Sequence, residues 1–218
     1  MVRSMLPSGG LYAITDSALH KGAALEQAVT EAIAGGARVI QYRDKSADAD
    51  RRHAEAAMLV RVCRQHGVPL IINDDVELAL ETEADGVHVG RDDTALANAR
   101  SRLGKDFIIG VSCYDQVRLA EAAQANGADY VAFGCMFAST TKPNAKLAEI
   151  STLERARDCI HLPIVAIGGI TPHNGGSLLE AGVDMLAVVT GVFADADPAE
   201  AARRYARLFV RQTQDEES

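Results

Sequence analysis

Short apolar runs alternate with alanine-rich, helix-like stretches along nearly the whole chain, and this alternation restricts the fold more than any other feature. Most of the runs are bounded by Gly, Pro or Asp, as is typical of parallel strands that are buried on both faces. We predict eight strands, at residues 11–15, 39–43, 69–73, 86–90, 107–112, 130–134, 163–169 and 185–190.

The stretches between these strands carry helix start signals. Thr171-Pro172 and Asp197-Pro198 each have the form of an N-cap residue followed by proline in the first helical position. Three segments that precede strands also resemble one another, EADG (83–86), NGAD (126–129) and AGVD (181–184), which indicates a repeated βα unit. The predicted helices include 23–34, 47–65, 114–125, 174–181 and 198–212.

Eight strands in strict alternation with helices predict an α/β protein that closes into a (β/α)8 barrel, or TIM barrel. An open doubly wound sheet with a dinucleotide site is less consistent with the sequence, because no G-x-G-x-x-G follows the first strand. The chain has 218 residues, or about 27 per unit, near the compact end for this fold. We therefore expect one domain over residues 1–218, with short flexible tails at about 1–9 and 212–218.

Composition disfavours several kinds of function. The net charge is −8, 5% of the residues are aromatic and Trp is absent, whereas a nucleic-acid binder needs a basic face and stacking rings. The N-terminus lacks the apolar stretch of a signal peptide, and no later run is long enough to span a bilayer. We therefore expect a cytoplasmic protein with no membrane contact. The four cysteines form no C-x-x-C pair, which favours buried, reduced thiols over disulfides or a zinc site.

In a (β/α)8 barrel the reactive groups gather at the carboxyl ends of the strands. Arg43, Lys45 and Lys142 would then point into one mouth from different strands; each alone is typical of a solvated loop, but together they predict a polyanionic ligand. Lys142 belongs to the loop FASTTKP (137–143), which places three hydroxyl groups beside it. Gly168-Gly169 would let a phosphate approach backbone N–H groups, which this fold favours over the alternative that they only permit a tight turn.

Two acidic residues follow neighbouring strands near this cationic cluster. Asp74 and Asp93 would repel a polyanion unless a cation lay between them, and Mg²⁺ binds one or two carboxylates together with phosphate oxygens and water. The alternative is that they cap the helices that begin near Val76 and Ala95. The sequence leaves both roles open.

His88 and Cys113 are the remaining reactive residues near the predicted strand ends. We interpret His88, inside the fourth strand, as a packed, hydrogen-bonded core residue. Cys113 has no base close to it in the sequence, and we interpret it as structural. An H-E-x-x-H motif is absent, which disfavours a zinc site.

Taken together, these motifs resemble the thiamine phosphate synthase family from LYAITD (11–16) to VVTGVF (188–193). Each motif is weak alone, but they occur in order on the expected strands. They are QYRDK (41–45), IND (72–74), DGVHVGRDD (85–93), GVS (110–112), STTKP (139–143), AIGGITPHN (166–174) and VVT (188–190).

The resemblance implies an enzyme that joins hydroxymethylpyrimidine diphosphate to a thiazole phosphate and releases pyrophosphate, with one Mg²⁺ per subunit. It implies Asp74 and Asp93 as the magnesium ligands, and Lys142, Arg43, Lys45 and Ser112 as catalytic residues. The pyrimidine diphosphate would be bound by Gln41, Tyr42, Arg43, Asp44, Lys45, Asn73, Ser112 and Lys142. The thiazole phosphate would be bound by Ser139, Thr140, Thr141, Gly169, Val189 and Thr190.

The sequence departs from the family pattern at a few positions. Ser139 stands where many relatives carry Thr, and Thr140 where Pro is common, but both keep or add a hydrogen-bond donor. Cys135-Met136 replaces a more usual small or proline-containing pair. Gly175-Gly176 opens a helix where Ala is usual, and each glycine costs about 1 kcal/mol of helix propensity.

Two other functions stay open. A thiazole tautomerase would share the barrel and the thiazole phosphate pocket but would not couple substrates; the presence of Lys142, Asp74, Asp93 and the QYRDK segment argues against it. A non-catalytic barrel that binds phosphorylated metabolites is the second. The expected partners are two small phosphorylated substrates, and the sequence leaves open a homo-oligomer.

Overall fold

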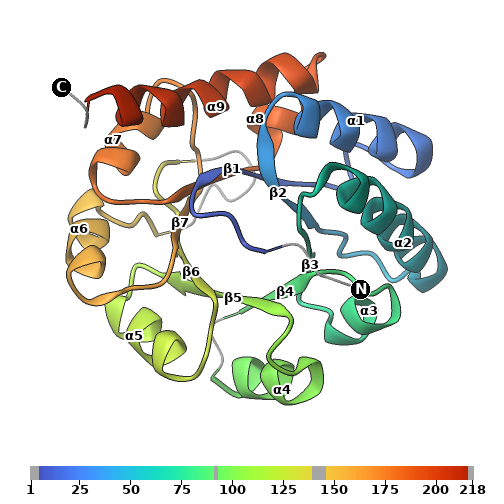
Figure 1. The fold of residues 1–218 in the computed structure, drawn as a ribbon, viewed down its shortest axis with the longest axis horizontal. Coiled ribbons are helices and arrows are strands. Elements are labelled where there is room, and N and C mark those ends of the chain that lie inside the picture. The colour runs from blue at the N-terminus through green and yellow to red at the C-terminus, as the bar shows by residue number, and fades with distance from the viewer. Residues whose placement is uncertain (1–4, 91–92, 139–145, 216–218) are drawn as a thin grey trace.

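A computed structural model of the chain describes residues 5–90, 93–138 and 146–215, with the backbone alone at 93–94 and 211–215. Its parallel strands close into one barrel in sequence order, and β8 pairs with β1 (Figure 1). The strands are β1 (Gly10–Ile14), β2 (Ala37–Tyr42), β3 (Leu70–Asn73), β4 (Gly86–Val89), β5 (Ile108–Tyr114), β6 (Tyr130–Gly134), β7 (Ile164–Ile167) and β8 (Met185–Val188). The predicted (β/α)8 barrel and its eight strands are therefore confirmed.

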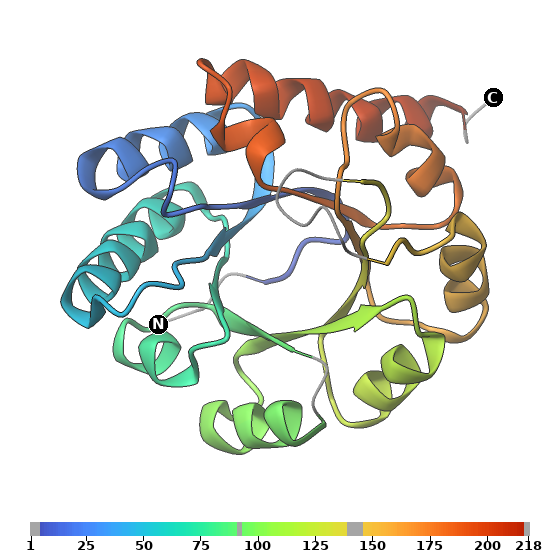
Figure 2. The same cartoon turned by 180° about the vertical axis from the view of Figure 1, so that it is seen from behind.

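Helices surround the barrel on its outer side (Figures 1 and 2). They are α1 (Gly22–Ala34), α2 (Ala49–His66), α3 (Val76–Glu81), α4 (Asp93–Leu103), α5 (Val117–Ala125), α6 (Ile150–Cys159), α7 (Gly175–Glu180), α8 (Thr190–Phe193) and α9 (Pro198–Asp215).

Several predicted boundaries were wrong. β8 ends at Val188, because Val189 and Thr190 already turn into the short helix α8. The helix predicted from 114 begins at Val117, because β5 continues to Tyr114. At the C-terminus, α9 continues beyond the predicted end at 212 to Asp215.

The start signal of α9 is confirmed, whereas that of α7 is confirmed only in part. The carboxylate of Asp197 accepts the backbone N–H of Glu200 at 2.9 Å and caps α9. Oγ1 of Thr171 accepts the backbone N–H of Asn174 at 3.3 Å, as a cap would, and in the same turn the backbone N–H of Thr171 donates to Oδ1 of Asn174 at 2.8 Å, but α7 begins only at Gly175. The same Asn174 side chain donates to the carbonyl of Gly169 at 3.1 Å, so this turn supports the loop after β7.

The core has two layers because successive strand residues point to opposite faces of the sheet. The outer layer lies between the strands and the helices and includes Leu11, Ile40 and Tyr42. The inner layer fills the barrel, and Leu6 packs against it, so the predicted N-terminal tail of 1–9 is partly anchored. The buried members of the inner layer are Tyr12, Ile14, Val39, Ile71, Ile108, Tyr130, Ala132, Val165, Met185 and Ala187.

The aspartates of the repeated segments EADG, NGAD and AGVD have a physical role at the amino ends of the strands. Asp85, Asp129 and Asp184 each precede an even-numbered strand, and each carboxylate accepts a backbone N–H of the strand before it. The distances are 2.9 Å to Leu70, 2.7 Å to Ile109 and 2.7 Å to Ile164. These bonds join neighbouring strands at the end of the barrel away from the predicted site.

The cysteines differ in burial. Cys63 and Cys113 are buried, as predicted, and burial raises the pKa of the Cys113 thiol to about 12. Cys135 and Cys159 are half-buried, which corrects the expectation of uniformly buried thiols. All of these thiols are free, and Cys113 fits the structural role that the sequence predicted.

The two glycines that open α7 are expected to respond in opposite ways to alanine. A Cβ at Gly175 would lie 2.9 Å from Cδ1 of Leu186 and of Leu208, whereas a Cβ at Gly176 would meet nothing within 4 Å. We therefore expect Gly176→Ala to raise the free energy of unfolding by up to about 1 kcal/mol. Gly175→Ala should lower it by about 1–3 kcal/mol through overpacking. Urea unfolding checks both values, and a gain in stability at both positions would contradict the packing account.

Candidate functional site

A cavity of about 870 Å³ opens at the carboxyl ends of the strands. Its volume is sufficient for small-molecule ligands. The loops that follow β2 to β8 all contribute lining residues, and β1 contributes residues of the strand itself. The predicted site residues that line it are Gln41, Arg43, Lys45, Asn73, Asp74, Ser112, Gly169, Val189 and Thr190.

Other predicted site residues fall outside the described part of the chain. Ser139, Thr140, Thr141 and Lys142 belong to the segment 139–145, which is not described. Asp93 is the first residue of α4, and only its backbone is described.

Arg43 and Lys45 bring positive charge to the cavity. Among the described residues, none of the ion pairs involves either side chain. Lys146, a third cation on the lining that the sequence did not single out, is paired with Asp115. Because Arg43 and Lys45 have no carboxylate partner in the described structure, an anionic ligand would meet their charge directly.

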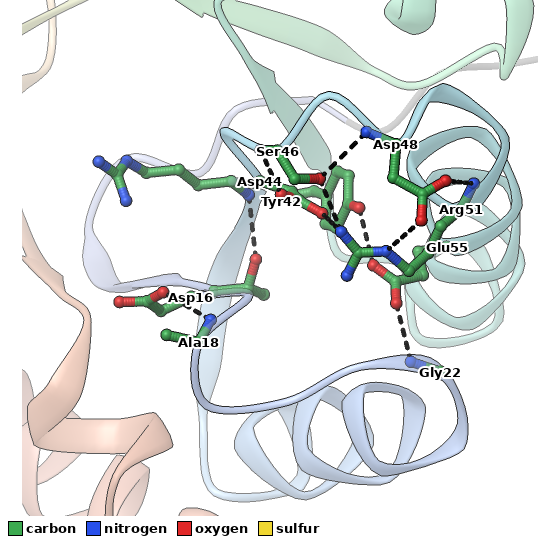
Figure 3. A network of polar contacts seen from close by, with 11 residues as sticks. Asp16, Ala18, Gly22, Tyr42, Asp44, Ser46, Asp48, Arg51 and Glu55 are labelled. Carbon is green, nitrogen blue, oxygen red and sulfur yellow. Dashed lines mark hydrogen bonds and ion pairs between the residues drawn. The ribbon is translucent and has the colours of Figure 1, made fainter.

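Tyr42 and Asp44, which flank Arg43 in sequence, point to the helix side of β2 (Figure 3). The hydroxyl of Tyr42 donates to Oε2 of buried Glu55 at 2.8 Å, and Oε1 of Glu55 accepts the backbone N–H of Gly22 at 2.8 Å. Burial and the Glu55 carboxylate raise the pKa of Tyr42 well above its usual value. The network ties β2 to the start of α1 and to α2.

The carboxylate of Asp44 is held by the loop that follows β2. It lies 2.8 Å from the Arg51 guanidinium and accepts the backbone N–H of Ser46 at 2.8 Å. Burial alone would raise its pKa, but the hydrogen bonds from Ser46 and Ser17 and the charge of Arg51 outweigh burial and lower it. Asp44 therefore stays ionised and is paired with Arg51.

Asp75, and not Asp74, has the helix-capping role that the sequence left open for Asp74. Asp75 caps α3, because its Oδ1 accepts the backbone N–H of Leu78 at 3.0 Å, and its other oxygen pairs with Arg52. Asp74 has a φ of 63° and donates its backbone N–H to the carbonyl of His88 at 2.8 Å. Its carboxylate accepts a hydrogen bond from Nδ2 of Asn73 at 2.7 Å. The capping alternative was wrong for Asp74, whose side chain lines the cavity.

The turn after β7 requires glycine at both of its positions. Gly168 and Gly169 have φ values of 105° and 61°, which lie in the left-handed region. A Cβ at Gly169 would lie 2.5 Å from the carbonyl oxygen of Ala138 and 2.6 Å from that of Phe137. Glycine is therefore required here because the turn packs against the loop after β6, and both glycines line the cavity.

A hydrogen-bonded chain of side chains forms the floor of the cavity. Nε2 of Gln41 donates to the hydroxyl of Tyr12, which lies 2.8 Å from that of Tyr130. The Tyr130 hydroxyl lies 2.9 Å from Nδ1 of His88, and Nε2 of His88 lies 2.8 Å from Oγ of Ser112. Burial lowers the pKa of His88 to about 4, although Asp74 opposes the shift, so the ring is neutral at pH 7.

His88 is therefore hydrogen-bonded, as predicted, but it lines the cavity as well as the core. Tyr12 and Tyr130 were not singled out from the sequence. The only signal for them is the strand period of two, which places Tyr12 on the same face as Ile14 and therefore inside the barrel. That signal does not reveal which partner a buried hydroxyl meets.

Among the described residues, no helix combines the length and the apolar character that crossing a membrane requires.

Comparison with known proteins gives one consistent result. The sequence pattern of the thiamine monophosphate synthase family matches residues 11–192. A thiamine-phosphate synthase from Chromobacterium violaceum is 53% identical over 200 residues, which cover 92% of this chain and 96% of that protein. One from Nitrosococcus oceani is 50% identical over 200 residues and 92% of each chain. The solved structure of a thiamine phosphate pyrophosphorylase from Pyrococcus furiosus superposes with a TM-score of 0.84 at 30% identity, covering 94% of this chain and 96% of that one.

The fold is a (β/α)8 barrel with a cavity at the carboxyl ends of its strands, and together with these relatives it defines an enzyme of the class that acts on small phosphorylated substrates. Within that class, the chain belongs to the thiamine monophosphate synthase family, and it is a transferase of thiamine biosynthesis.

Proposed function

We propose that this chain joins hydroxymethylpyrimidine diphosphate to thiazole phosphate, giving thiamine phosphate and pyrophosphate. The observation that carries the proposal is one cavity in which Arg43 and Lys45, which form no ion pair among the described residues, and the glycine turn at Gly168-Gly169 lie at the ends of different strands. Such a cavity is suited to two phosphorylated ligands at once. The two bacterial relatives named as synthases, half identical over most of this chain, support the same reaction.

In the proposed reaction, the ring nitrogen of the thiazole attacks the methylene carbon of the pyrimidine, and the bond from that carbon to the diphosphate oxygen breaks. The bonding electrons leave with the diphosphate. The electron-rich aminopyrimidine would delocalise positive charge on the methylene, so departure can precede attack. The reaction needs no protein nucleophile, and the barrel would act by orienting both substrates and excluding water.

The pyrimidine diphosphate would lie against Gln41, Arg43, Lys45, Asn73 and Ser112, all of which line the cavity. Arg43 and Lys45, with Lys142 from the loop outside the described residues, would stabilise the charge that develops on the leaving diphosphate. The thiazole phosphate would bind at Gly169, Val189 and Thr190, with Ser139, Thr140 and Thr141 completing its site.

Asp74 fits a role as a magnesium ligand, because its carboxylate lines the cavity and does not cap a helix. Asp93, at the start of α4, is the second proposed ligand. Two carboxylates leave the other positions of Mg²⁺ to phosphate oxygens and water, which is its usual coordination. Bound there, the ion would neutralise charge on the diphosphate.

Phosphorylated substrates do not cross membranes freely because their charge is costly to desolvate. This supports the cytoplasm as the proposed location.

Incubation of the purified protein with both substrates and Mg²⁺ tests the proposal. We expect thiamine phosphate and pyrophosphate to form in equal amounts, and neither to form when one substrate is omitted. A tautomerase would alter a thiazole phosphate substrate without consuming the pyrimidine. A non-catalytic barrel would bind one or both ligands and release no pyrophosphate. Either of the last two results would refute the synthase proposal.

Tyr42 and Asp44 are expected to support the loop that follows β2 and not to contact substrate. Tyr42→Phe removes one donor from the buried Glu55 carboxylate, which should lower the free energy of unfolding by about 1–3 kcal/mol. The KM for the pyrimidine diphosphate should stay within about threefold of the wild-type value, because the lost hydrogen bond is not to substrate. A loss of about 1.4 kcal/mol in binding free energy would instead change affinity tenfold. Thermal unfolding and steady-state kinetics measure the two effects. A tenfold rise in KM with unchanged stability would instead return Tyr42 to the binding site.

A further inference from the structure

The hydrogen-bonded chain of side chains on the cavity floor crosses the barrel between strands that are far apart in sequence. It starts at Gln41 on β2 and ends at Ser112 on β5, and both of these residues line the cavity. Tyr12 and Tyr130, in its middle, are 1% and 0% exposed. Its interior hydroxyls therefore have to satisfy one another, because a buried polar group without a partner is costly.

The hydrogens of this chain run in one direction. A tyrosine hydroxyl has a single hydrogen, and a neutral imidazole has one N–H and one acceptor nitrogen. Because Gln41 donates to Tyr12, the hydrogen of Tyr12 goes to Tyr130, and that of Tyr130 goes to Nδ1 of His88. Because Nδ1 accepts this hydrogen bond, it carries no hydrogen itself, so the ring has its single hydrogen on Nε2 and donates it to Ser112.

This direction determines what the two ends offer to a ligand. Ser112 accepts from His88, so its own hydrogen is left to donate into the cavity. Gln41 uses its amide nitrogen on Tyr12, so its carbonyl oxygen is left as an acceptor. The opposite direction would require the Gln41 amide, both tyrosine hydroxyls, the His88 tautomer and Ser112 to reverse together.

We propose that Tyr12, Tyr130 and His88 are positioning residues that orient Gln41 as an acceptor and Ser112 as a donor, and thereby select an aminopyrimidine ring over its oxo counterpart. The amino ring presents an N–H donor beside an unprotonated ring nitrogen. The oxo ring presents a carbonyl acceptor beside a ring N–H, which reverses both partners. The choice of ring rests on the proposed function, whereas the direction of the chain does not.

The tautomer is measured on the free protein by ¹⁵N NMR of labelled histidine, with the His88 signal assigned as the one that His88→Gln removes. We expect hydrogen on Nε2 and none on Nδ1. Tyr130→Phe removes the donor to Nδ1 and should leave a mixture of tautomers. Ser112→Ala is the matched control, because it removes the partner of Nε2 but keeps the Tyr130 bond, and it should retain the Nε2–H form. A wild-type protein with hydrogen on Nδ1 would overturn the inference.

Selectivity is measured by competition between the aminopyrimidine diphosphate and its oxo analogue. We expect the wild-type enzyme to favour the amino ring by about 100-fold or more in kcat/KM, since the wrong ring leaves polar groups of the site unpaired. Tyr130→Phe should reduce this ratio at least about tenfold. Tyr12→Phe provides a second variant if Tyr130→Phe does not fold. It frees the Gln41 amide while Tyr130 still donates to His88, so selectivity should fall with the tautomer unchanged.

The two proposals fail in different ways. If no thiamine phosphate forms from the amino substrate, the synthase proposal is wrong and the NMR result still decides the direction of the chain. If the enzyme couples both rings equally well, or if Tyr130→Phe leaves the ratio unchanged, the positioning role is wrong while the synthase proposal holds.

Discussion

Replacing Arg43 by alanine is expected to lower kcat for thiamine phosphate formation by about 100- to 1,000-fold, the usual cost of losing one donor directed at a developing charge. The residue lines the cavity directly after β2. The charge on the leaving diphosphate grows during bond cleavage, so the guanidinium should contribute more in the transition state than in substrate binding. The KM for the pyrimidine diphosphate should therefore change less than kcat.

Two further variants make the Arg43 result specific. Arg43→Lys keeps the charge but loses the two parallel donors of the guanidinium, and it should recover only part of the activity. Arg61→Ala makes the same change in net charge at an exposed position of α2 and should leave kcat near the wild-type value. Similar small losses in Arg43→Ala and Arg61→Ala would mean that Arg43 is only a solvated loop residue.

Asp74→Asn is expected to raise the Mg²⁺ concentration needed for half-maximal activity by at least about 10-fold. Mutation of residues that only hydrogen-bond to a metal ligand already lowers metal affinity by about that factor. Asparagine is a suitable replacement because, like aspartate, it tolerates the left-handed backbone found at Asp74, where φ is 63°. The fold should therefore be unchanged, and the loss should come from the missing negative charge. Magnesium titration of initial rates measures the shift.

The neighbouring residue supplies the control. Asp75→Ala removes the cap of α3 and the ion pair with Arg52, and it should lower the free energy of unfolding by about 1–2 kcal/mol. Its magnesium dependence should match the wild type. If Asp75→Ala instead shifted the magnesium requirement and Asp74→Asn did not, the metal would have to be assigned to the capping residue.

The barrel could be predicted because its signal is local and repeated. Each strand is a short apolar run, and the order of strands and helices admits few arrangements. Boundaries were less predictable. Val189 and Thr190 continue an apolar run in sequence, yet they belong to the turn into α8. Thr171-Pro172 has the form of a cap, but α7 begins only at Gly175. Thr171 and Asn174 first form a hydrogen-bonded turn, and Asn174 is the residue before the helix.

The candidate site was predictable as a set of loops, because the carboxyl ends of parallel strands meet at one end of a barrel. Individual side chains were harder to place. Asp74 and Asp75 are identical residues side by side in the sequence. The left-handed backbone conformation at Asp74 separates their roles, so that Asp74 lines the cavity and Asp75 caps α3. Tyr42 and Asp44 lie between two cavity residues in sequence, yet both are held from the helix side by Glu55 and Arg51.

The sequence alone determined the fold class, the end of the barrel that carries the chemistry, and the cationic and glycine-rich loops found there, since each depends on a local pattern or on a general rule of strand connection. Tertiary structure alone decided which carboxylate faces the cavity and how Tyr12, Tyr130 and His88 join across its floor. The bond between the two tyrosines spans 118 positions of the chain. A contact over that distance depends on the closure and register of the barrel, which no local segment encodes.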